Sequence, residues 1–487
     1  MTVTSLSNFA ARLVQRLGVS SCLIDAATGE TIGPPDLPRL VSSFGAGLIS
    51  AGLRKGDRIL IGCLLSPPSG IAYLGAMYAG LVPVPVEEGA LVSSGEFWAQ
   101  GCGARAVWTE RCFRFHWARD PQLLILHGHP AEQPTSMNPA AACSENDLAA
   151  LVATSGSTGV PRFVMISHGN LTANTEAIIR SQHLANDDRA MLILPLSYCF
   201  GASVFHTHLY QGGGVVFDRR FMFPDKVLRA IDRYGCTTFA GVPTVYNILL
   251  RRSNIRSIPM PTVRRFLQAG GALAPQRIRE MRAVVPTADF YVMYGQTEAT
   301  SRISCLDPER LEDKLGSVGQ PLDNLTVRIV DEDGRGLPSG EAGEILVKGP
   351  SISRGYLNDP EESRRVFRDG WLCTGDLAHQ DEDGYIWIRG RKSAFLKIRG
   401  VRVSCAEVEA TVAAVPGVYE CAATVAPHEE ACEALVLWDV PEQGGQNIAE
   451  RVRRSLPVHW TCESIEIVAE LPKTSNGKVS RSSLRAS

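Results

Sequence analysis

The 487-residue sequence lacks the patterns that mark several common protein classes. Its net charge is −2, from 49 Lys and Arg against 51 Asp and Glu. This balance gives no basic excess for nucleic acid or for an acidic membrane surface. The 13 cysteines include no C-x-x-C pair, which excludes the usual zinc and thioredoxin motifs. No window of about 20 uninterrupted apolar residues is present, so no membrane span is predicted. A small molecule or a protein partner fits this composition better.

The first residues, MTVTSLSNFAARLVQRLG, lack the charged start and long apolar run of a signal peptide and instead have the spacing of an amphipathic helix. With an odd number of cysteines, this predicts reduced thiols and a cytoplasmic protein. Apolar residues make up 45% and charged residues 21% of the chain, as in ordinary globular proteins. The length exceeds what one hydrophobic core usually supports, so at least two domains are expected.

Strand and helix patterns alternate along the first two thirds of the chain. Short apolar strands such as RILIGC, LVPVPV and AMLILPL are separated by segments with helical apolar spacing. This alternation predicts parallel sheets covered by helices. After Asp323 the pattern changes to period-two strands with turns between them, and Asp333-Gly334 is a hairpin signal. A further change at Gly390 introduces a small α+β pattern. We therefore expect an α/β core over residues 1–390, with a β-rich subdomain at about 323–390, and a C-terminal domain over residues 391–487.

The most unusual stretch is ATSGSTGVPRFVMISHGN, residues 153–170. Small hydroxylated residues in a row cannot pack a core, and glycine weakens both helices and strands. The stretch lies between two apolar runs, so it is expected to connect two extended segments at a sheet edge. It is not a Walker A loop, which needs G-x-x-x-x-G-K-[ST] before a helix. Its backbone N–H groups, its hydroxyls and Arg162 nevertheless suit a phosphate site of another design. A flexible Ser/Gly linker is the alternative.

Four further stretches carry groups with a possible chemical role. YGQTEAT, residues 294–300, places an aromatic ring near Glu298, which suits a nucleobase and a Mg²⁺ ion. GWLCTGDLA offers Asp376 for the hydroxyls of a ribose, GRKSAFLKIRGVRV is a cationic segment at the expected domain boundary, and LPKTSNGKVSR has Lys478 in a glycine-bearing turn. Taken singly, each is equally typical of a hairpin turn, a solvated strand or a chain end.

Together and in this order, the five motifs resemble those of the AMP-forming adenylating enzymes, a family of acyl-CoA synthetases, adenylation domains of peptide synthetases and luciferases. The resemblance covers nearly the whole chain, including LRKGDRILI and AMYAGLVPVPV near the N-terminus. It implies a large α/β domain of parallel-type sheets, a β-rich subdomain and a small α+β domain that rotates about a hinge. It also implies ATP and Mg²⁺ as cofactors, a carboxylic acid as substrate, and the thiol of CoA or of a carrier protein's phosphopantetheine as acceptor.

The resemblance assigns a role to each matched position. The ATP phosphates would be bound by Thr154, Ser155, Gly156, Ser157, Thr158, Gly159 and Arg162. Adenine and ribose would contact Gly270, Gly271, Ala272, Tyr294, Gly295, Asp376 and Arg391. The catalytic set would be Thr297 at the α-phosphate, Glu298 at Mg²⁺, Lys478 between the acid and the α-phosphate, and Lys397 for the second step. The acyl pocket would comprise Tyr198, Phe200, Gly201, Gly241, Gln296 and Arg302, with Gly400 at the thiol channel and Ser393 at the hinge.

The sequence departs from the family pattern at several positions. Arg162-Phe163 replaces Lys-Gly after the phosphate loop, and Ser393 replaces the usual Asp or Lys of the hinge. Adenylation domains for α-amino acids carry an aspartate where this chain has Gly201, so an ordinary α-amino acid is disfavoured. The histidine that many acyl-CoA synthetases carry near Tyr198 is also missing. Arg302 could meet a second carboxylate or polar group of the substrate, and a structural or solvent-exposed ion pair is the alternative.

The sequence therefore predicts a ligase that converts an acyl or aryl acid and MgATP into acyl-AMP and pyrophosphate, and then transfers the acyl group to a thiol. An amide-forming relative is an alternative, because Ser393 and the missing histidine leave room for it. A degenerate nucleotide-binding or partner-binding relative is another. A P-loop kinase or NTPase is disfavoured by the missing Walker A unit. A carrier protein remains a possible partner.

Overall fold

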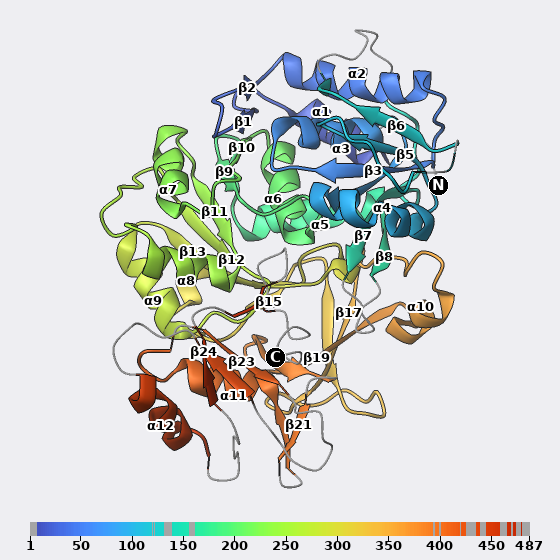
Figure 1. The fold of residues 1–487 in the computed structure, drawn as a ribbon. Helices are drawn as coiled ribbons and strands as arrows, with labels where there is room; N and C mark the ends of the chain where they lie inside the picture. The colour runs from blue at the N-terminus through green and yellow to red at the C-terminus, as the bar shows by residue number, and fades with distance from the viewer. Residues whose placement is uncertain are drawn as a thin grey trace.

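The computed structural model of the protein describes residues 7–118, 120, 122–130, 139–154, 161–392, 395–398, 401–418, 420–424, 435–438, 445–457, 465–468, 471–473 and 479. Two parallel-type sheets with flanking helices form its N-terminal part, an antiparallel sheet follows, and a smaller α+β unit lies at the C-terminal end (Figure 1). The α/β class predicted from the alternating patterns is confirmed. The domain limits at residues 323 and 390 stay predictions.

The larger sheet has nine strands in the order β15-β14-β13-β12-β11-β9-β10-β1-β2. Its six inner strands, from β13 to β1, run parallel, and β2, β14 and β15 are antiparallel additions at the two edges. The inner strands are buried and short, as expected for a parallel sheet covered on both faces. The strands are β1 (Leu23–Asp25), β2 (Thr31–Ile32), β9 (Arg189–Leu192), β10 (Gly214–Phe217), β11 (Thr238–Gly241), β12 (Arg265–Gln268), β13 (Asp289–Tyr294), β14 (Ser304–Leu306) and β15 (Gln320–Pro321).

A second parallel sheet has four strands in the order β4-β3-β5-β6, comprising β3 (Arg58–Cys63), β4 (Val82–Glu87), β5 (Ala104–Thr109) and β6 (Leu124–His127). Helix α3 (Pro67–Tyr78) contacts β3 and β4 of this sheet and β1 of the larger one, so it lies between them. Helix α6 (Cys199–Tyr210) contacts β9, β10 and α1 (Phe9–Arg16), and all of its residues from 200 to 210 are buried. The remaining helices of this part are α2 (Asp36–Ser50), α4 (Glu88–Cys102), α5 (His168–Ser181), α7 (Pro224–Arg233), α8 (Pro243–Arg252) and α9 (Pro275–Val284).

An antiparallel sheet continues the chain, as the period-two pattern predicts. It comprises β16 (Thr326–Val330), β17 (Gly343–Lys348), β18 (Phe367–Arg368), β19 (Trp371–Gln380) and β20 (Ile386–Arg391), with helix α10 (Pro360–Val366) beside it. The turn expected at Asp333-Gly334 is present, and Gly334 has a φ of +81°, a value that glycine adopts without strain. The hairpin of β7 (Leu148–Thr154) and β8 (Arg162–Ser167) forms a separate two-stranded unit that flanks the expected phosphate loop.

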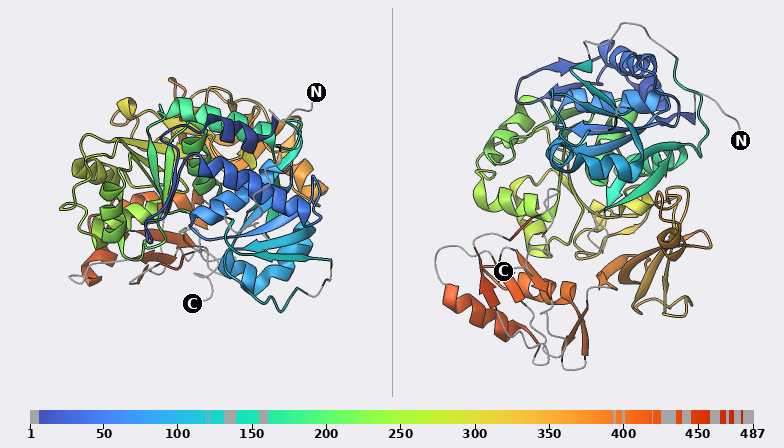
Figure 2. Two further views of the ribbon diagram at one scale, coloured as in Figure 1. Left: turned by 90° about the horizontal axis from the view of Figure 1, so that it is seen from above. Right: turned by 45° about the vertical axis from the view of Figure 1, so that its right-hand side comes forward.

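The C-terminal unit has its own small core. Val408, Val412, Val418, Ile448 and Val452 pack together, apart from the core of the N-terminal sheets. Its elements form a mixed α and β unit, as the pattern after Gly390 predicts, and they are β21 (Phe395–Ile398), β22 (Val401–Ser404), α11 (Cys405–Ala413), β23 (Cys421–Thr424), β24 (Leu435–Trp438), α12 (Gly445–Ser455) and β25 (Ile465–Ile467). Figure 2 shows these elements on the side of the molecule opposite to α2 and α3. Within the described ranges, no helix is both long enough and apolar enough to cross a membrane.

Three buried histidines in the N-terminal core make stability depend on pH. Burial lowers the pKa of His168 and of His208 to about 4 and that of His206 to about 3. Their Nε2 atoms have no hydrogen-bond partner among the described residues. Because the unfolded chain binds these protons near pH 6.5, unfolding takes up protons between about pH 6.5 and pH 4. The resulting stability is fully present above pH 6.5 and is lost as the pH falls.

We expect the free energy of unfolding to fall between pH 6.5 and pH 5 by up to about 1.4 kcal/mol per pH unit for each of these histidines. Urea unfolding at a series of pH values measures this slope. His208→Gln should reduce the slope, whereas His127→Gln, which changes an exposed histidine, should leave it unchanged. A free energy of unfolding that stays constant over this pH range would contradict the prediction.

Candidate active site

Three predicted nucleotide-binding residues meet where β13 ends. Tyr294 is the last residue of β13, and its hydroxyl donates a hydrogen bond of 2.6 Å to Asp376 Oδ2 on β19. Asp376 lies opposite Arg391 of β20 in the sheet register, and Arg391 Nε donates to Asp376 Oδ1 at 2.9 Å. The structure thus brings together the expected adenine residue and the expected ribose pair from three different strands.

The charges and protons of Tyr294, Asp376 and Arg391 leave the Asp376 carboxylate able to accept further hydrogen bonds. Asp376 is 6% exposed, and its charge is balanced by Arg391. The same carboxylate raises the pKa of Arg391, while burial and then Asp376 raise the pKa of Tyr294 well above its usual value. Both groups therefore stay protonated at neutral pH. Because a carboxylate has about four acceptor positions, Asp376 can accept vicinal hydroxyls in addition to these two donors.

The turn after β13 requires glycine at one position. A Cβ on Gly295 would lie 1.9 Å from the carbonyl oxygen of Ser301, so no other residue fits. The chain continues through Gln296 into a short 3₁₀ helix, Thr297–Ala299, and Thr300 has a φ of +67° with its hydroxyl bonded to the carbonyl of Ser351 at 2.6 Å. This constrained turn holds Thr297 and Glu298 directly beyond the carboxyl end of β13. Ligands of open α/β sheets bind at such strand ends.

Tyr356, which the sequence analysis did not single out, holds Glu298. The Tyr356 hydroxyl donates to Glu298 Oε1 at 2.8 Å, and the backbone N–H of Ser353 donates to the Glu298 carbonyl at 2.8 Å. Burial and the Glu298 carboxylate raise the pKa of Tyr356, so this donor keeps its proton. The only sequence signal is a tyrosine shortly before α10, and no spacing rule connects it to a residue 58 positions earlier.

Arg162, the expected cation of the phosphate loop, pairs with carboxylates in this structure. Its Nε lies 3.1 Å from Asp359 and one of its terminal nitrogens 3.3 Å from Glu362, and its guanidinium is 5.8 Å from the centre of the Tyr356 ring. An ATP phosphate would therefore have to replace these carboxylates as its partner. Thr154 ends β7, its hydroxyl 3.5 Å from the Arg162 carbonyl. Ser155, Gly156, Ser157, Thr158 and Gly159 lie outside the described residues.

Phe163 does not crowd the loop as a bulky replacement for glycine could. Its side chain is 4% exposed and packs edge-on against Trp98, with ring centres 5.9 Å apart. It lies in the hydrophobic cluster around the four-stranded sheet, and successive side chains of a strand point to opposite faces. The Arg162-Phe163 pair therefore places one residue at the ion pairs and the other in the core.

The residues expected to line the acyl pocket are of two kinds: some contribute a buried side chain, and others are glycines that close packing requires. Tyr198 and Phe200 are buried at the start of α6, with ring centres 6.3 Å apart, and the guanidinium of Arg302 lies 5.2 Å from the centre of the Phe200 ring. A Cβ on Gly201 would lie 2.3 Å from the Pro195 carbonyl oxygen, so packing alone requires glycine there. The absence of aspartate at this position is therefore not evidence about the substrate. A Cβ on Gly241 would likewise lie 2.8 Å from Val245.

The glycine turn after β12 borders this region. Gly270 has a φ of +85°, and Gln268 Nε2 donates to the carbonyl of Gly271 at 2.7 Å. A Cβ on Gly271 would approach Pro243 at 3.3 Å, so the turn packs closely against the start of α8. Ala272 follows directly. These residues lie beyond the carboxyl end of β12, next to the end of β13 in the same sheet.

The C-terminal unit contacts the N-terminal part close to this turn. Thr244 at the start of α8 donates to Glu420 at 3.0 Å, and Lys473 pairs with Glu420 and donates to Thr244 at 3.2 Å. Arg277 of α9 also donates to the Val418 carbonyl at 3.0 Å. Lys478 and the hinge and channel residues Ser393 and Gly400 lie outside the described residues, and Lys397 is described only as part of β21. Five residues of extended chain span at most about 18 Å, which limits the distance from Lys473 to Lys478.

The described residues contain no cluster of three or more His, Cys, Asp or Glu side chains that could bind a metal ion by themselves. Magnesium in nucleotide sites is usually held by one or two carboxylates together with substrate phosphates. Glu298 fits this role, because Tyr356 engages Oε1 and leaves Oε2 without a hydrogen bond from the described residues.

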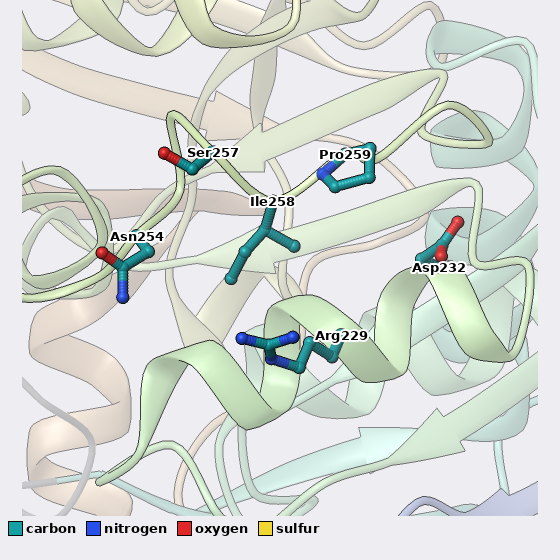
Figure 3. Close-up of a pocket in the computed structure, with 6 residues that line it drawn as sticks. All are labelled: Arg229, Asp232, Asn254, Ser257, Ile258 and Pro259. Carbon is teal, nitrogen blue, oxygen red and sulfur yellow. The ribbon is translucent and has the colours of Figure 1, made fainter.

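A groove of about 440 Å³ is on a different part of the surface. Figure 3 shows Arg229 and Asp232 of α7 facing the loop from Asn254 to Pro259. It shares no residue with the site around Tyr294 and Glu298.

The Tyr356 hydrogen bond can be tested directly. Tyr356→Phe keeps the ring and its contacts but removes a hydrogen bond to a charged group, worth about 1.5–3 kcal/mol. We expect the apparent affinity for MgATP to fall about tenfold or more. Titration of the nucleotide at fixed free Mg²⁺ measures it. Tyr385→Phe, at another buried tyrosine, is the control, and an equal effect in the two variants would refute the assignment.

Comparison with known proteins matches most of the chain to one family, and the chain belongs to it. The family model described as AMP-binding enzyme matches residues 15–357, and that of the AMP-binding enzyme C-terminal domain matches residues 407–478. Among curated proteins, a feruloyl-CoA synthase from Amycolatopsis sp is 30% identical over 475 residues, covering 94% of each chain.

Solved structures of acid–CoA ligases and related enzymes also superpose on nearly the whole chain. ATP-bound MatB from Rhodopseudomonas palustris superposes with a TM-score of 0.90 at 26% identity, covering 99% of this chain and 98% of the other. The anthranilate CoA ligase AuaEII in complex with anthranoyl-AMP gives 0.89 at 25% identity, covering 100% and 98%.

Proposed function

The chain belongs to the AMP-forming adenylating enzymes, and from that premise we propose that it is an acid–thiol ligase acting on an aryl or acyl carboxylic acid and coenzyme A. In the first step the acid carboxylate attacks the α-phosphorus of ATP, and pyrophosphate leaves as acyl-AMP forms. In the second step the CoA sulfur attacks the acyl carbon, the thiol loses its proton, and AMP leaves with the electron pair of the broken acyl–oxygen bond.

The observation that carries the proposal is the convergence of Tyr294, Asp376 and Arg391 beside Thr297 and Glu298. The first three residues form a polar, partly buried site for adenosine, with Asp376 as acceptor for the ribose hydroxyls. The other two occupy the turn where the α-phosphate and its counter-ion would lie. Mg²⁺ bound at Glu298 would neutralise phosphate charge. No described feature supports an amine acceptor over a thiol.

Lys478 supplies the cation that the first step needs. A carboxylate and a phosphate repel each other, so a positive charge helps most where they meet in the transition state. One charge at about 4 Å and an effective dielectric of about 20 contributes roughly 4 kcal/mol. This corresponds to about three decades in rate. Thr297 would donate its hydroxyl to the α-phosphate.

The names of the relatives support the choice of acid and thiol. The feruloyl-CoA synthase and the 4-coumarate–CoA ligases act on aryl acids and CoA, as their names state, at 27–30% identity. The buried aromatic rings of Tyr198 and Phe200 suit an aryl group. No disulfide joins any two of the described cysteines, which supports a reducing compartment such as the cytoplasm.

We expect acid-dependent ATP–pyrophosphate exchange by the purified protein, and a decrease of about 1000-fold in Lys478→Ala. The assay should use benzoic, cinnamic, fatty, dicarboxylic and amino acids in parallel. Lys348→Ala, which changes an exposed lysine of β17, is the matched control and should keep full activity. Exchange that survives in Lys478→Ala would remove this lysine from the mechanism, and exchange with no acid would refute the proposed activity.

A further inference from the structure

Arg302 is a buried cation for which the described residues provide no anionic partner. The residue is 2% exposed and is among the largest fully buried side chains of the protein. No carboxylate of the described residues forms a salt bridge with it. A guanidinium cannot lose its charge easily, so it stays positive even where burial disfavours the charge. Such a charge is strongly unfavourable in a protein interior unless something of opposite charge binds to it.

The neighbours of Arg302 compensate its charge only in part. One terminal nitrogen contacts Met293 Sδ, a weak acceptor, and the guanidinium lies over the ring of Phe200 at 5.2 Å. Cys305 and Tyr198 are close enough to influence the charge electrostatically. Burial raises the pKa of Cys305 to about 11 and raises that of Tyr198 further above its usual value, so both are neutral at physiological pH.

The fold holds the backbone at this position without help from the side chain. The N–H of Arg302 donates to Asn174 Oδ1 at 3.2 Å, and Asn174 Nδ2 donates to the Arg302 carbonyl at 2.9 Å. Arg265 provides the contrast, because it is also buried but pairs with the buried carboxylate of Asp188 at 2.6 Å. The charge of Arg265 therefore has an anionic partner within the protein, although Nε and one terminal nitrogen of Arg265 form no hydrogen bond, whereas the described residues provide no anionic partner for Arg302.

The position of Arg302 connects it to the substrate. It follows Glu298 by four residues, directly after the turn that carries Thr297, and its side chain packs on Phe200 at the start of α6. Thr300 and Ser301, which directly precede Arg302 in the chain, line a small cavity whose walls are both polar and apolar. This cavity of about 20 Å³, the size of one water molecule, lies between α5, α6 and the turn and is lined by Asn174, Cys199, Ser203, His206, Thr300 and Ser301 among others. The Nε2 atom of His206 has no described partner there.

We propose that Arg302 binds a second carboxylate of the acid substrate, at the end remote from the carboxylate that is activated. This inference rests on the proposed function and specifies its substrate class. The reacting carboxylate would lie at Thr297 and the α-phosphate, and the second carboxylate would form a bidentate ion pair with the guanidinium. A monoacid would leave the buried charge unpaired, so the site would select against it.

The test compares acids in matched pairs, cinnamate with 4-carboxycinnamate and benzoate with terephthalate. We expect the wild type to prefer the diacid of at least one pair in kcat/KM for pyrophosphate exchange. Arg302→Met should reduce the preference about 100-fold or more, mainly through KM for the diacid. Arg302→Lys keeps the charge but loses the planar guanidinium, so its preference for the diacid should lie between those of the wild type and Arg302→Met.

Thermal melting separates recognition from a structural role. Without ligand, Arg302→Met should melt at the same temperature as the wild type or higher, because it removes an unpaired buried charge. Arg265→Met should melt at a lower temperature, because it leaves Asp188 unpaired. Arg302→Met melting as low as Arg265→Met would overturn the proposal, and so would an equal loss of activity on both members of each pair, or a wild type that prefers the monoacids.

The same measurement distinguishes failure of this inference from failure of the proposed function. Binding of a diacid requires no turnover, so it can be detected by a shift in melting temperature in the presence of AMP. A shift given by the diacid and not by its monoacid, and lost in Arg302→Met, supports the proposal even if no acid supports exchange. Absence of that shift in a wild type that adenylates monoacids would leave the proposed function intact and overturn the role of Arg302.

Discussion

The hydrogen bond from Tyr294 to Asp376 joins the two main structural parts of the N-terminal region. Tyr294 ends an inner strand of the parallel sheet, and Asp376 lies in the antiparallel sheet that follows it in the chain. Because Asp376 is also bound by Arg391, the last strand of that sheet is tied to the same point. A nucleotide site composed of residues from both sheets depends on this connection, and the constrained glycine turn after Tyr294 supplies the remaining groups beside it.

Buried charged side chains that have a partner within the protein differ from a buried charged side chain that is available to bind a ligand. Asp376 with Arg391, and Asp188 with Arg265, are buried or partly buried charges whose partners come from the protein itself. The cost of burying each charge is offset within the folded chain. Within the described part of the chain, the guanidinium of Arg302 contacts a thioether and an aromatic face, which are neutral. An anion from outside is the remaining source of compensation, and the acid is the anion that this site is built to receive.

Regular elements were predictable from the sequence because their signals are local. Apolar runs between helical patterns predicted strands such as β3, β4 and β9, and the change to period two after Asp323 predicted the antiparallel sheet. The clustering of Tyr294 with Asp376 and Arg391 was accessible only through the family resemblance, since these residues lie up to 97 positions apart. Three further features have no local signal. Tyr356 donates to Glu298 from 58 positions further along the chain, Arg162 pairs with carboxylates about 200 residues away, and the glycine at 201 is required by the carbonyl oxygens it faces.

The contacts of the C-terminal unit are consistent with a part that changes position. It has its own core around Val408 and Val452, separate from the core of the N-terminal sheets. The described contacts between α8 or α9 and this unit are polar, at Thr244, Glu420 and Lys473 and at Arg277. Polar groups of this kind can exchange a protein partner for water at small cost, whereas an extended apolar interface cannot. Two half-reactions that need different groups at one site can therefore be served by rotation of this unit, with the nucleotide-binding residues of the two sheets remaining in place.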